Sequence, residues 1–318
     1  MTDEWWGSPQ WTKAGEQWAH NRLGLLGFQP TGQVEDVSIQ PWSAVWRIPT
    51  AVGPVLLKQT TSARRSEGGV QAFVADRADR YVDRPLAYTA GSGRILLRDL
   101  GLTMFGASPD NRGIEIRPVA QILADYARLQ HATIGAATDA SAAGLESWDP
   151  GRAVDDAAMQ ARQLHALPPS DARHISTAQR DRILDARSTI ESAARVVAAS
   201  PIPCCLEHGD LWPGNVIPPQ DPDSSYRLID FGDAAWSHPF LSPIMLIIEC
   251  RFRWAADDQP DRLDLNHPAI TATITDAYLS HWTDYASMPD LRHTLHCALQ
   301  LAHYVEARPG SIPSLKPA

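Results

Sequence analysis

Short runs of apolar residues dominate the first third of the chain and predict β-strands. Within residues 34–60, two such regions flank a turn at 49–54 that has proline at both ends and contains a glycine. This pattern predicts a β-hairpin. Two further strands are expected, at about 85–89 and 94–98, around a Gly-Ser-Gly turn. The first hundred residues therefore predict an antiparallel sheet.

Apolar residues at helical spacing predict helices before, within and after this sheet. A Ser-Pro pair near the N-terminus is typical of a helix start, and tryptophans follow it on one face. Residues 62–82 are expected to form one helix of the sheet region, although Gly68 and Gly69 weaken it. From about residue 115 the chain is predicted to be mostly helical, with a short β section at 204–233. The later helices are expected at 117–134, 151–166, 177–199 and within 240–307.

The net charge of −9 over 318 residues is unevenly distributed. Residues 1–100 have a net charge of +1, whereas residues 101–318 have −10. The acidic second part argues against a nucleic-acid partner and is compatible with a cationic small substrate, although many of these acids are expected on solvated helix surfaces. No apolar run approaches the roughly 18 residues of a membrane helix. The N-terminus does not have the pattern of a secretory signal, and no C-x-x-C pair occurs among four cysteines, so we expect a cytoplasmic protein with reduced thiols.

The sequence HGDLWPGN contains the pattern H-x-D-x-x-x-x-N, formed by His208, Asp210 and Asn215. A proline and a glycine separate the acid from the amide, so the interior of a helix is not expected here. The segment is either an ordinary turn with accidental polar residues or a site that holds a metal and a reacting group. The downstream sequence favours a site, because a short apolar strand at 227–229 ends at Asp230, which Phe-Gly follows.

Asn215 and Asp230 are expected to meet at the ends of two neighbouring strands. Their side chains offer the hard oxygen ligands that Mg²⁺ prefers, with phosphate and water completing the coordination. Asp210 is then left to accept a proton or to orient a hydroxyl group. This division of roles is what phosphoryl transfer requires.

Together these motifs resemble the eukaryotic-kinase-like superfamily of aminoglycoside phosphotransferases and choline kinases. The resemblance covers the ordered spacing of the whole chain. It implies an α+β, bilobal protein-kinase-like fold, in which the N-lobe has an antiparallel sheet with one helix and the C-lobe is mostly helical. Residues 1–99 would form the nucleotide-binding N-lobe, and residues 100–318 the C-lobe with the catalytic loop and the acceptor site.

By this resemblance Asp210 would be the catalytic base, and Asn215 and Asp230 would be the ligands of Mg²⁺. His208 would support the loop rather than take part in the chemistry. Trp212 stands where protein kinases have a lysine two residues after the catalytic aspartate, which fits small-molecule kinases better.

The resemblance also assigns nucleotide-binding residues in the first hundred positions. Lys58, in the apolar strand VLLKQ, would pair with the α- and β-phosphates, and Glu67 would orient it. Taken alone, Lys58 could be an edge-strand lysine that points to water, and Glu67 could be an acid favoured by a helix N-terminus. Ser43 would contact the phosphates from a loop without glycine. The hinge that meets the purine through its backbone would comprise Arg98, Asp99 and Leu100.

The chain departs from the family pattern after Asp-Phe-Gly. A His-Pro-Phe segment at 238–240 stands where Asp-Pro is usual, and Ser242 stands where a second aspartate is usual. These departures put the support under the catalytic loop in doubt. Asp233 is interpreted as a helix N-cap rather than as an acid that supports the site.

The implied activity is transfer of the γ-phosphoryl group of ATP, or of GTP, to a hydroxyl group of a small molecule. An aminoglycoside-type antibiotic is one candidate acceptor, and the acidic loop at 257–264 would help to bind a polycation unless it is simply solvated. A metabolic kinase of a sugar, an amino alcohol or a biosynthetic intermediate is the alternative. A catalytically silent binding module ranks lower, because it would be expected to have lost one of the residues Lys58, Asp210, Asn215 and Asp230.

Other sites are disfavoured. His293, His296 and His303 lie at helical spacing near the C-terminus but lack a fourth ligand for zinc, so an inter-helix surface or the acceptor cleft is expected for them. The sequence has no G-x-x-x-x-G-K-[ST] motif, which excludes a P-loop kinase.

Overall fold

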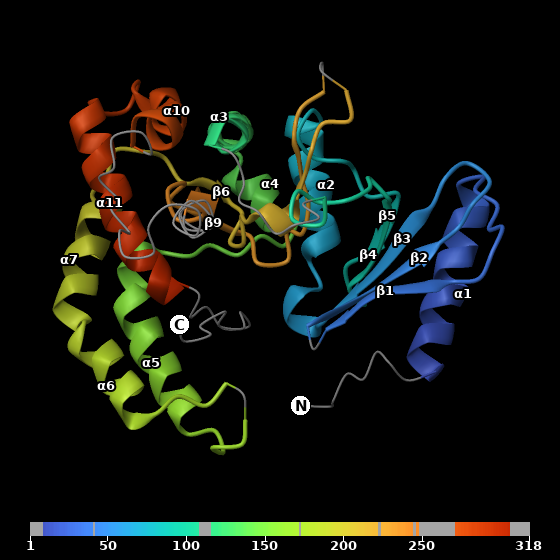
Figure 1. The fold of residues 1–318 in the computed structure, drawn as a ribbon, viewed down its shortest axis with the longest axis horizontal. Helices are drawn as coiled ribbons and strands as arrows, with labels where there is room; N and C mark the ends of the chain where they lie inside the picture. The colour runs from blue at the N-terminus through green and yellow to red at the C-terminus, as the bar shows by residue number, and fades with distance from the viewer. Residues whose placement is uncertain are drawn as a thin grey trace. The chain divides into compact units, whose positions relative to one another are not determined.

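The structure is a computed structural model, and it describes residues 9–40, 42–107, 116–171, 173–221, 224–243, 246–247 and 271–305. Its elements are labelled along the chain in Figure 1. Contacts divide the chain into two compact units. The first unit comprises residues 1–109, 138–145 and 214–234, and the second comprises residues 110–137, 146–213 and 235–318. The lobe boundary at residue 99 stays a prediction.

A five-stranded antiparallel sheet with the order β1-β2-β3-β5-β4 forms the centre of the first unit (Figure 1). The hairpin predicted at 34–60 and the two later strands are confirmed, and β1 is an edge strand that pairs with β2, the first arm of the hairpin. The five strands are β1 (Glu35–Gln40), β2 (Ser43–Ile48), β3 (Val55–Thr60), β4 (Ala87–Thr89) and β5 (Arg94–Arg98).

Helix α1 (Pro9–Leu25) packs on the sheet. Ala19 and Leu23 of α1 are fully buried in one hydrophobic cluster with Trp46 of β2 and Leu57 of β3. Side chains two apart on a strand share a face, so alternate positions of β2 and β3 supply this core. The N-terminal amphipathic helix therefore docks on its own fold, as its pattern predicts.

Helix α2 (Glu67–Ala78) begins five residues later than predicted, after a short 3-10 turn. The glycines that weaken its sequence pattern allow close packing. A Cβ atom on Gly68 would lie 2.6 Å from Cβ of Tyr88, and one on Gly69 would lie 2.7 Å from the carbonyl oxygen of Ala143. The two glycines thus lower helix propensity but let the first turn of α2 approach its neighbours.

Residues 214–234 pack with the first unit although they are distant from it in sequence. They form the short hairpin of β7 (Val216–Ile217) and β8 (Arg227–Leu228). The backbone N–H of Leu228 donates a hydrogen bond to the carbonyl of Tyr81, at 2.8 Å. This connection brings the Asp-Phe-Gly segment into the unit that carries Lys58.

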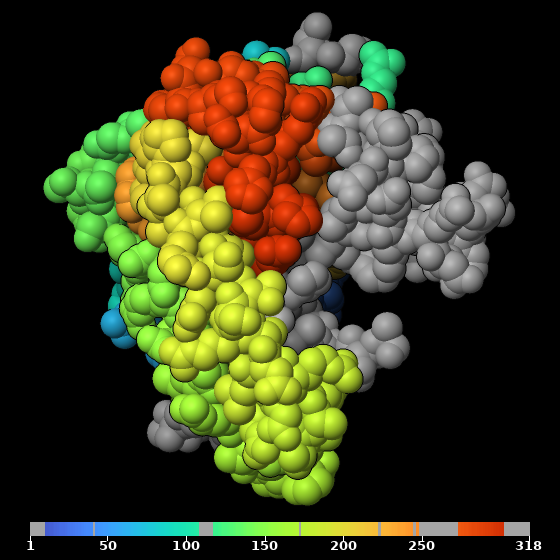
Figure 2. All heavy atoms as spheres, turned by 90° about the vertical axis from the view of Figure 1, so that its left-hand side faces the viewer, coloured from blue at the N-terminus to red at the C-terminus, as the bar shows by residue number. Residues whose placement is uncertain are grey.

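The second unit is mostly helical, as predicted. Residues 117–134 and 151–166 form single helices, whereas 177–199 is divided in two by a short break. Figure 2 shows α11 alongside α7 on the surface. The helices are α3 (Ile116–Thr133), α5 (Ala153–His165), α6 (Thr177–Asp185), α7 (Arg187–Ala198), α10 (Asp276–Leu279) and α11 (Met288–Val305).

A two-stranded sheet of β6 (Cys205–Glu207) and β9 (Ala235–Ser237) completes the second unit. Aromatic side chains fill the core beside it: Phe240 makes edge contacts with Tyr278 and Trp282, at 5.4 and 5.7 Å between ring centroids. None of the helices in the described part of the chain is long and apolar enough to cross a membrane.

Candidate active site

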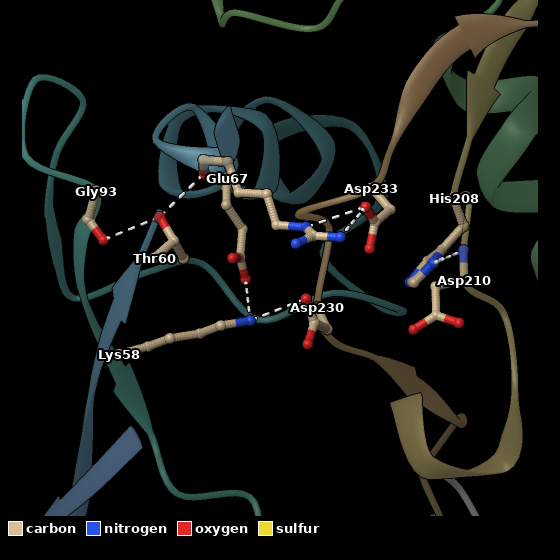
Figure 3. Close-up of polar contacts among 9 residues, drawn as sticks. Lys58, Thr60, Glu67, Gly93, His208, Asp210, Asp230 and Asp233 are labelled. Carbon is tan, nitrogen blue, oxygen red and sulfur yellow. Dashed lines mark hydrogen bonds and ion pairs between the residues drawn. The ribbon is translucent and has the colours of Figure 1, made fainter. Parts of the chain in front are cut away.

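Lys58 is buried on the central strand β3, with only 6% of its surface exposed. Its Nζ atom lies 2.8 Å from Oε1 of Glu67 and 2.8 Å from Oδ1 of Asp230 (Figure 3). A buried ammonium group is costly unless it is paired, and here two carboxylates pair with it. The alternative of an edge-strand lysine that points to water is therefore wrong, and the structure brings together three residues that the sequence singled out separately.

The three charges shift one another's protonation. Burial acts to lower the pKa of Lys58, but the nearby charges of Asp230 and Glu67 outweigh it and hold that pKa above its usual range. Burial raises the pKa of Glu67 to about 7, against the opposing attraction of Lys58. The second carboxylate oxygen of Glu67 has no hydrogen-bond partner among the described residues, which agrees with a poorly solvated acid.

Asn215 and Asp230 lie at the same end of the β7–β8 hairpin. The backbone N–H of Ile229 donates to the carbonyl of Asn215 at 3.1 Å, which continues the ladder by one residue beyond the strands. Asn215 is 6% exposed, and Asp230 has a φ of 66°, a left-handed conformation that few non-glycine residues adopt. The two strand ends therefore meet as the sequence predicted.

This donor set fits Mg²⁺. It offers one carboxylate and one amide, both hard oxygen donors, and leaves room in the coordination shell for phosphate and water. No group of three His, Cys, Asp or Glu side chains in the described part of the chain is placed to bind a metal ion. An ion at Asn215 and Asp230 would thus depend on a phosphate-bearing ligand, as Mg²⁺ commonly does.

Asp233 is not a helix N-cap, contrary to the interpretation from the sequence. Its Oδ1 atom accepts hydrogen bonds from Nε and Nη2 of Arg64, at 3.0 and 2.6 Å (Figure 3). The residues after it lead into strand β9 rather than into a helix. Sequence reasoning missed Arg64 entirely, because an arginine in a Ser-Ala-Arg-Arg run carries no local sign of a partner 169 positions away.

Asp210 belongs to the second unit, on the loop after β6. His208 is fully buried, and its Nδ1 atom accepts a hydrogen bond from the backbone N–H of Asp210 at 3.3 Å. The backbone N–H of His208 in turn donates to the hydroxyl of Tyr126 at 2.9 Å. His208 therefore supports the loop through its ring, as expected.

Ser242 supplies the support that the missing aspartate left in doubt. Its hydroxyl oxygen accepts a hydrogen bond from the backbone N–H of Gly209 at 2.7 Å, and the same hydroxyl donates to Glu207. Gly209 has a φ of 83°, which glycine adopts without strain. Glu207 is fully buried on β6. A carboxylate therefore supports the loop by way of the Ser242 hydroxyl. The loop that carries Asp210 is thus held on both sides of its first turn.

The His-Pro-Phe segment is structural. His238 is buried, and its Nδ1 atom accepts a hydrogen bond from the backbone N–H of Phe240 at 3.2 Å. The carbonyl of Pro239 accepts from Gln130 and from the hydroxyl of Tyr278, both at 2.9 Å. Burial lowers the pKa of His238 to about 3, so the ring is neutral in the folded protein at ordinary pH.

The remaining predicted nucleotide-binding residues lie in the first unit. Ser43 is buried at the start of β2, in a hairpin whose strands leave only positions 41 and 42 between them. Position 41 lies outside the described residues. The hinge segment follows β5: Arg98 donates to Asp83 at 3.0 Å, Asp99 pairs with Arg47 at 2.7 Å, and the carbonyl of Leu100 accepts from Gln220 at 3.1 Å. Their contacts with a nucleotide stay predictions.

Two other features fall partly or wholly outside the described residues. The acidic loop at 257–264 lies outside them, as does the side chain of His303. His293 and His296 lie on α11, where Nε2 of His296 is 3.3 Å from the amide nitrogen of Gln300.

Comparison with solved structures confirms the fold that the sequence resemblance implies. APH(2″)-IIia in complex with GDP and kanamycin is 13% identical, and the match covers 91% of this chain and 89% of that one, with a TM-score of 0.56. Macrolide 2′-phosphotransferase MphH from Brachybacterium faecium is 16% identical over 94% and 97%, with a TM-score of 0.56. Plasmodium vivax ethanolamine kinase is 11% identical over 86% and 74%, with a TM-score of 0.59. No protein-family model matches this chain, and no curated protein matches its sequence. At these identities the likeness establishes the fold: an α+β fold shared with small-molecule kinases and antibiotic phosphotransferases.

Proposed function

We propose that this protein is a nucleotide-dependent O-phosphotransferase, which moves the γ-phosphoryl group of ATP or GTP to a hydroxyl group of a small molecule. The observation that carries the proposal is the buried ammonium of Lys58, held between Glu67 and Asp230. An ammonium group has three N–H donors, and the carboxylates accept from two of them. In this proposal the third donates to a phosphate oxygen.

The nucleotide-binding roles follow from this arrangement. Lys58 would neutralise charge on the α- and β-phosphates, and Glu67 would fix the direction of its side chain. Asn215 and Asp230 would hold Mg²⁺ at the end of the β7–β8 hairpin. Magnesium, when bound, neutralises charge on the phosphate oxygens and helps to position them. Ser43 and the backbone of Arg98, Asp99 and Leu100 complete the proposed nucleotide site.

Asp210 would receive the proton of the acceptor hydroxyl. Its loop is fixed by Tyr126, His208 and Ser242, so its carboxylate is presented on a rigid support rather than on a mobile tip. A positioned general base requires this kind of support, because its efficiency depends on geometry. Charge neutralisation and positioning would then supply most of the rate, as is usual for phosphoryl transfer.

The acceptor is proposed as a class rather than as a compound. The fold is shared with a kanamycin-bound protein, a macrolide phosphotransferase and an ethanolamine kinase, which supports either an antibiotic or a metabolic alcohol. The net charge of −10 in residues 101–318 favours a cationic acceptor over an anionic one. An aminoglycoside-type antibiotic and an amino alcohol are both cationic, whereas a neutral sugar is not attracted by this negative charge.

The test is a screen for acceptor-dependent release of nucleoside diphosphate. The purified protein is supplied with Mg²⁺ and either ATP or GTP, and panels of aminoglycosides, macrolides, sugars and amino alcohols are added in turn. At least one acceptor should raise the release rate well above the rate without acceptor. Asp210→Asn serves as the matched control, and it should lower that rate by roughly two to four orders of magnitude.

A silent binding module makes the opposite forecast. It would bind nucleotide without any acceptor-dependent release, and Asp210→Asn would change neither quantity. Equal background rates for the wild type and Asp210→Asn across all four panels, with measurable nucleotide binding, would favour that module over the enzyme.

A further inference from the structure

A second ion pair meets the Asp-Phe-Gly turn three residues after the first. We propose that Arg64 and Asp233 are a positioning pair, which holds this turn in the conformation that lets Asp230 act on the magnesium-bound phosphates. The inference rests on the proposed function, and it adds two residues that the motifs do not assign. Neither residue is proposed to touch the nucleotide.

The geometry of the pair is that of a fixed contact. Two guanidinium nitrogens of Arg64 converge on Oδ1 of Asp233, at 3.0 and 2.6 Å (Figure 3). The side chain of Arg64 is only 10% exposed, and that of Asp233 is 28% exposed. A charge-assisted contact with this degree of burial is stronger and more directional than a surface ion pair.

Arg64 is itself tied to the strand that carries Lys58. Its carbonyl lies 3.1 Å from the hydroxyl of Thr60, the last residue of β3, and the same hydroxyl lies 3.3 Å from the carbonyl of Gly93 (Figure 3). Thr60 is 2% exposed. Strand β3 therefore reaches the Asp-Phe-Gly turn by two routes, one from Lys58 to Asp230 and one from Thr60 through Arg64 to Asp233.

The turn between these two contacts needs support. Asp230 holds a φ of 66°, a conformation that costs a non-glycine residue free energy and persists only where the surroundings enforce it. Gly232 is packed tightly: a Cβ atom there would lie 3.1 Å from Cδ of Arg64 and 3.2 Å from Oε2 of Glu67. The aliphatic part of Arg64 thus covers the turn while its guanidinium group fixes Asp233.

Loss of the pair should weaken nucleotide binding that depends on Mg²⁺ but not nucleotide binding that is independent of Mg²⁺. Lys58 acts as a point charge on the phosphates whether or not the metal is present. Asp230 acts through Mg²⁺, and its direction depends on the backbone of the turn. We therefore expect variants of the pair to lose the magnesium-dependent part of nucleotide affinity and to retain the magnesium-independent part.

The experiment is calorimetric titration of ATP and GTP into the full-length protein, with excess Mg²⁺ and again with excess EDTA. Asp233→Asn should weaken the affinity measured with Mg²⁺ by roughly tenfold and change the affinity in EDTA by less than about twofold. Arg64→Lys keeps the charge but loses the paired nitrogens, so it should show a smaller loss of the same kind. The charge-exchanged double variant, Arg64→Asp with Asp233→Arg, should bind nucleotide more tightly in Mg²⁺ than Arg64→Asp alone, because it restores an opposite-charge pair.

Asp139→Asn is the matched control, because Asp139 pairs with Arg77 on the surface of the same unit. It should leave both affinities unchanged. Thermal unfolding of each variant identifies any general loss of structure, which would weaken both affinities together.

Equal weakening in Mg²⁺ and in EDTA, or no change beyond that of the Asp139→Asn control, would overturn the positioning role while leaving the phosphotransferase proposal intact. A wild-type protein that binds no nucleotide under either condition would instead overturn the proposed function, and the inference with it.

Discussion

The ammonium group of Lys58 lies 2.8 Å from Oδ1 of Asp230, although 172 positions of sequence separate the two residues. This contact joins the central strand of the sheet to the Asp-Phe-Gly turn. The same ammonium lies 2.8 Å from Glu67 at the start of α2. Because one cation is shared by two carboxylates, removal of any one member changes the charge balance of the other two.

Lys58→Met should destabilise the protein, and the loss should depend on pH. Removal of one partner from a buried ion pair typically costs about 3–5 kcal/mol, because it leaves the other charge uncompensated. Glu67 can escape this cost by protonation, since its pKa is already about 7. Denaturant unfolding should therefore show that Lys58→Met lowers the free energy of unfolding, relative to wild type, by more at pH 9 than at pH 6.

The double variant Lys58→Met with Glu67→Gln is the control for this prediction. It removes both charges, so at pH 9 it should be more stable than Lys58→Met alone. If the single and double variants lose the same unfolding free energy at pH 9, the charge of Lys58 does not compensate the buried charge of Glu67.

Gly68→Ala should destabilise the protein, although alanine is the better helix former. Helix propensity alone favours alanine by about 1 kcal/mol. In α2, however, the new Cβ would lie 2.6 Å from Cβ and 2.9 Å from Cγ of Tyr88, a contact that backbone movement must relieve. Overpacking of this kind typically costs about 1–3 kcal/mol.

Gly24→Ala provides the opposite case within the same unit. Gly24 lies in α1, and nothing lies within 4 Å of the position of its Cβ atom. This variant should be as stable as the wild type or more stable, by up to about 1 kcal/mol. Thermal unfolding of both variants checks the pair, and a stabilised Gly68→Ala protein would contradict the packing described for α2.

His238 should make the protein less stable in acid. Its pKa is about 3 in the folded state, because burial disfavours the charged ring, and 6.5 is the usual value. Between these values the unfolded chain binds a proton that the folded protein does not, so stability falls as pH decreases from 6.5 towards 3. One such proton corresponds to about 1.4 kcal/mol per pH unit.

Glu67 acts in the opposite direction over part of this range. Its raised pKa means that the folded protein holds a proton that the unfolded chain releases, so its contribution to stability is lost as pH rises from 4.5 to about 7. Comparison with His238→Asn separates the two, because asparagine can accept the hydrogen bond from Phe240 without titrating. The difference in unfolding free energy between wild type and this variant should change with pH between 6.5 and 3. A constant difference would mean that His238 does not resist protonation in the folded state.

Ser242→Ala should lower kcat more than it weakens nucleotide binding. The substitution leaves the backbone N–H of Gly209 and the buried carboxylate of Glu207 without their shared hydroxyl. The loop of Asp210 then loses a support on one side, whereas Lys58 and Asp230 are untouched. If Asp210 is the general base, as proposed, a positioned base contributes roughly 10²–10⁴-fold to the rate, so the decrease in kcat should not exceed that range.

Ser280→Ala is the control for Ser242→Ala. Ser280 is exposed, and its hydroxyl donates to the carbonyl of Ala277, three residues earlier in the chain. Its loss should leave kcat and nucleotide affinity unchanged. If Ser242→Ala reduced nucleotide affinity as strongly as kcat, the role assigned to the Glu207–Ser242 contact would be wrong.

The strands and most helices could be predicted from the sequence because hydrophobic period reports which face of an element is buried. The short apolar runs of β2 and β3 and the helical spacing of apolar residues in α3 are signals of this kind. Lys58, Asn215 and Asp230 could also be singled out, because each is a polar residue beside a short apolar strand.

Arg64, Glu207 and the pairing of Asp233 could not be predicted in the same way. Their meaning depends on a partner that only the fold brings close, and no local pattern identifies it. The role of Gly68 was hidden for a related reason: its sequence signal is a weakened helix, whereas its benefit is the approach of Tyr88. Tertiary packing therefore explains the glycine at position 68, which helix propensity alone would count as unfavourable.

In the proposed function Asp230 serves nucleotide binding through the metal, whereas Asp210 serves the chemical step. Calorimetric titration of nucleotide in the presence of Mg²⁺ distinguishes these two roles. Wild type and Asp210→Asn should bind ATP or GTP with affinities within about threefold of each other, because Lys58, Asn215 and Asp230 remain in both. Asp230→Ala should bind at least tenfold more weakly, because it loses both the proposed metal ligand and a partner of Lys58. Equal losses of affinity in Asp210→Asn and Asp230→Ala would show that the two acids do not have these separate roles, and no nucleotide binding by the wild type would rule out both.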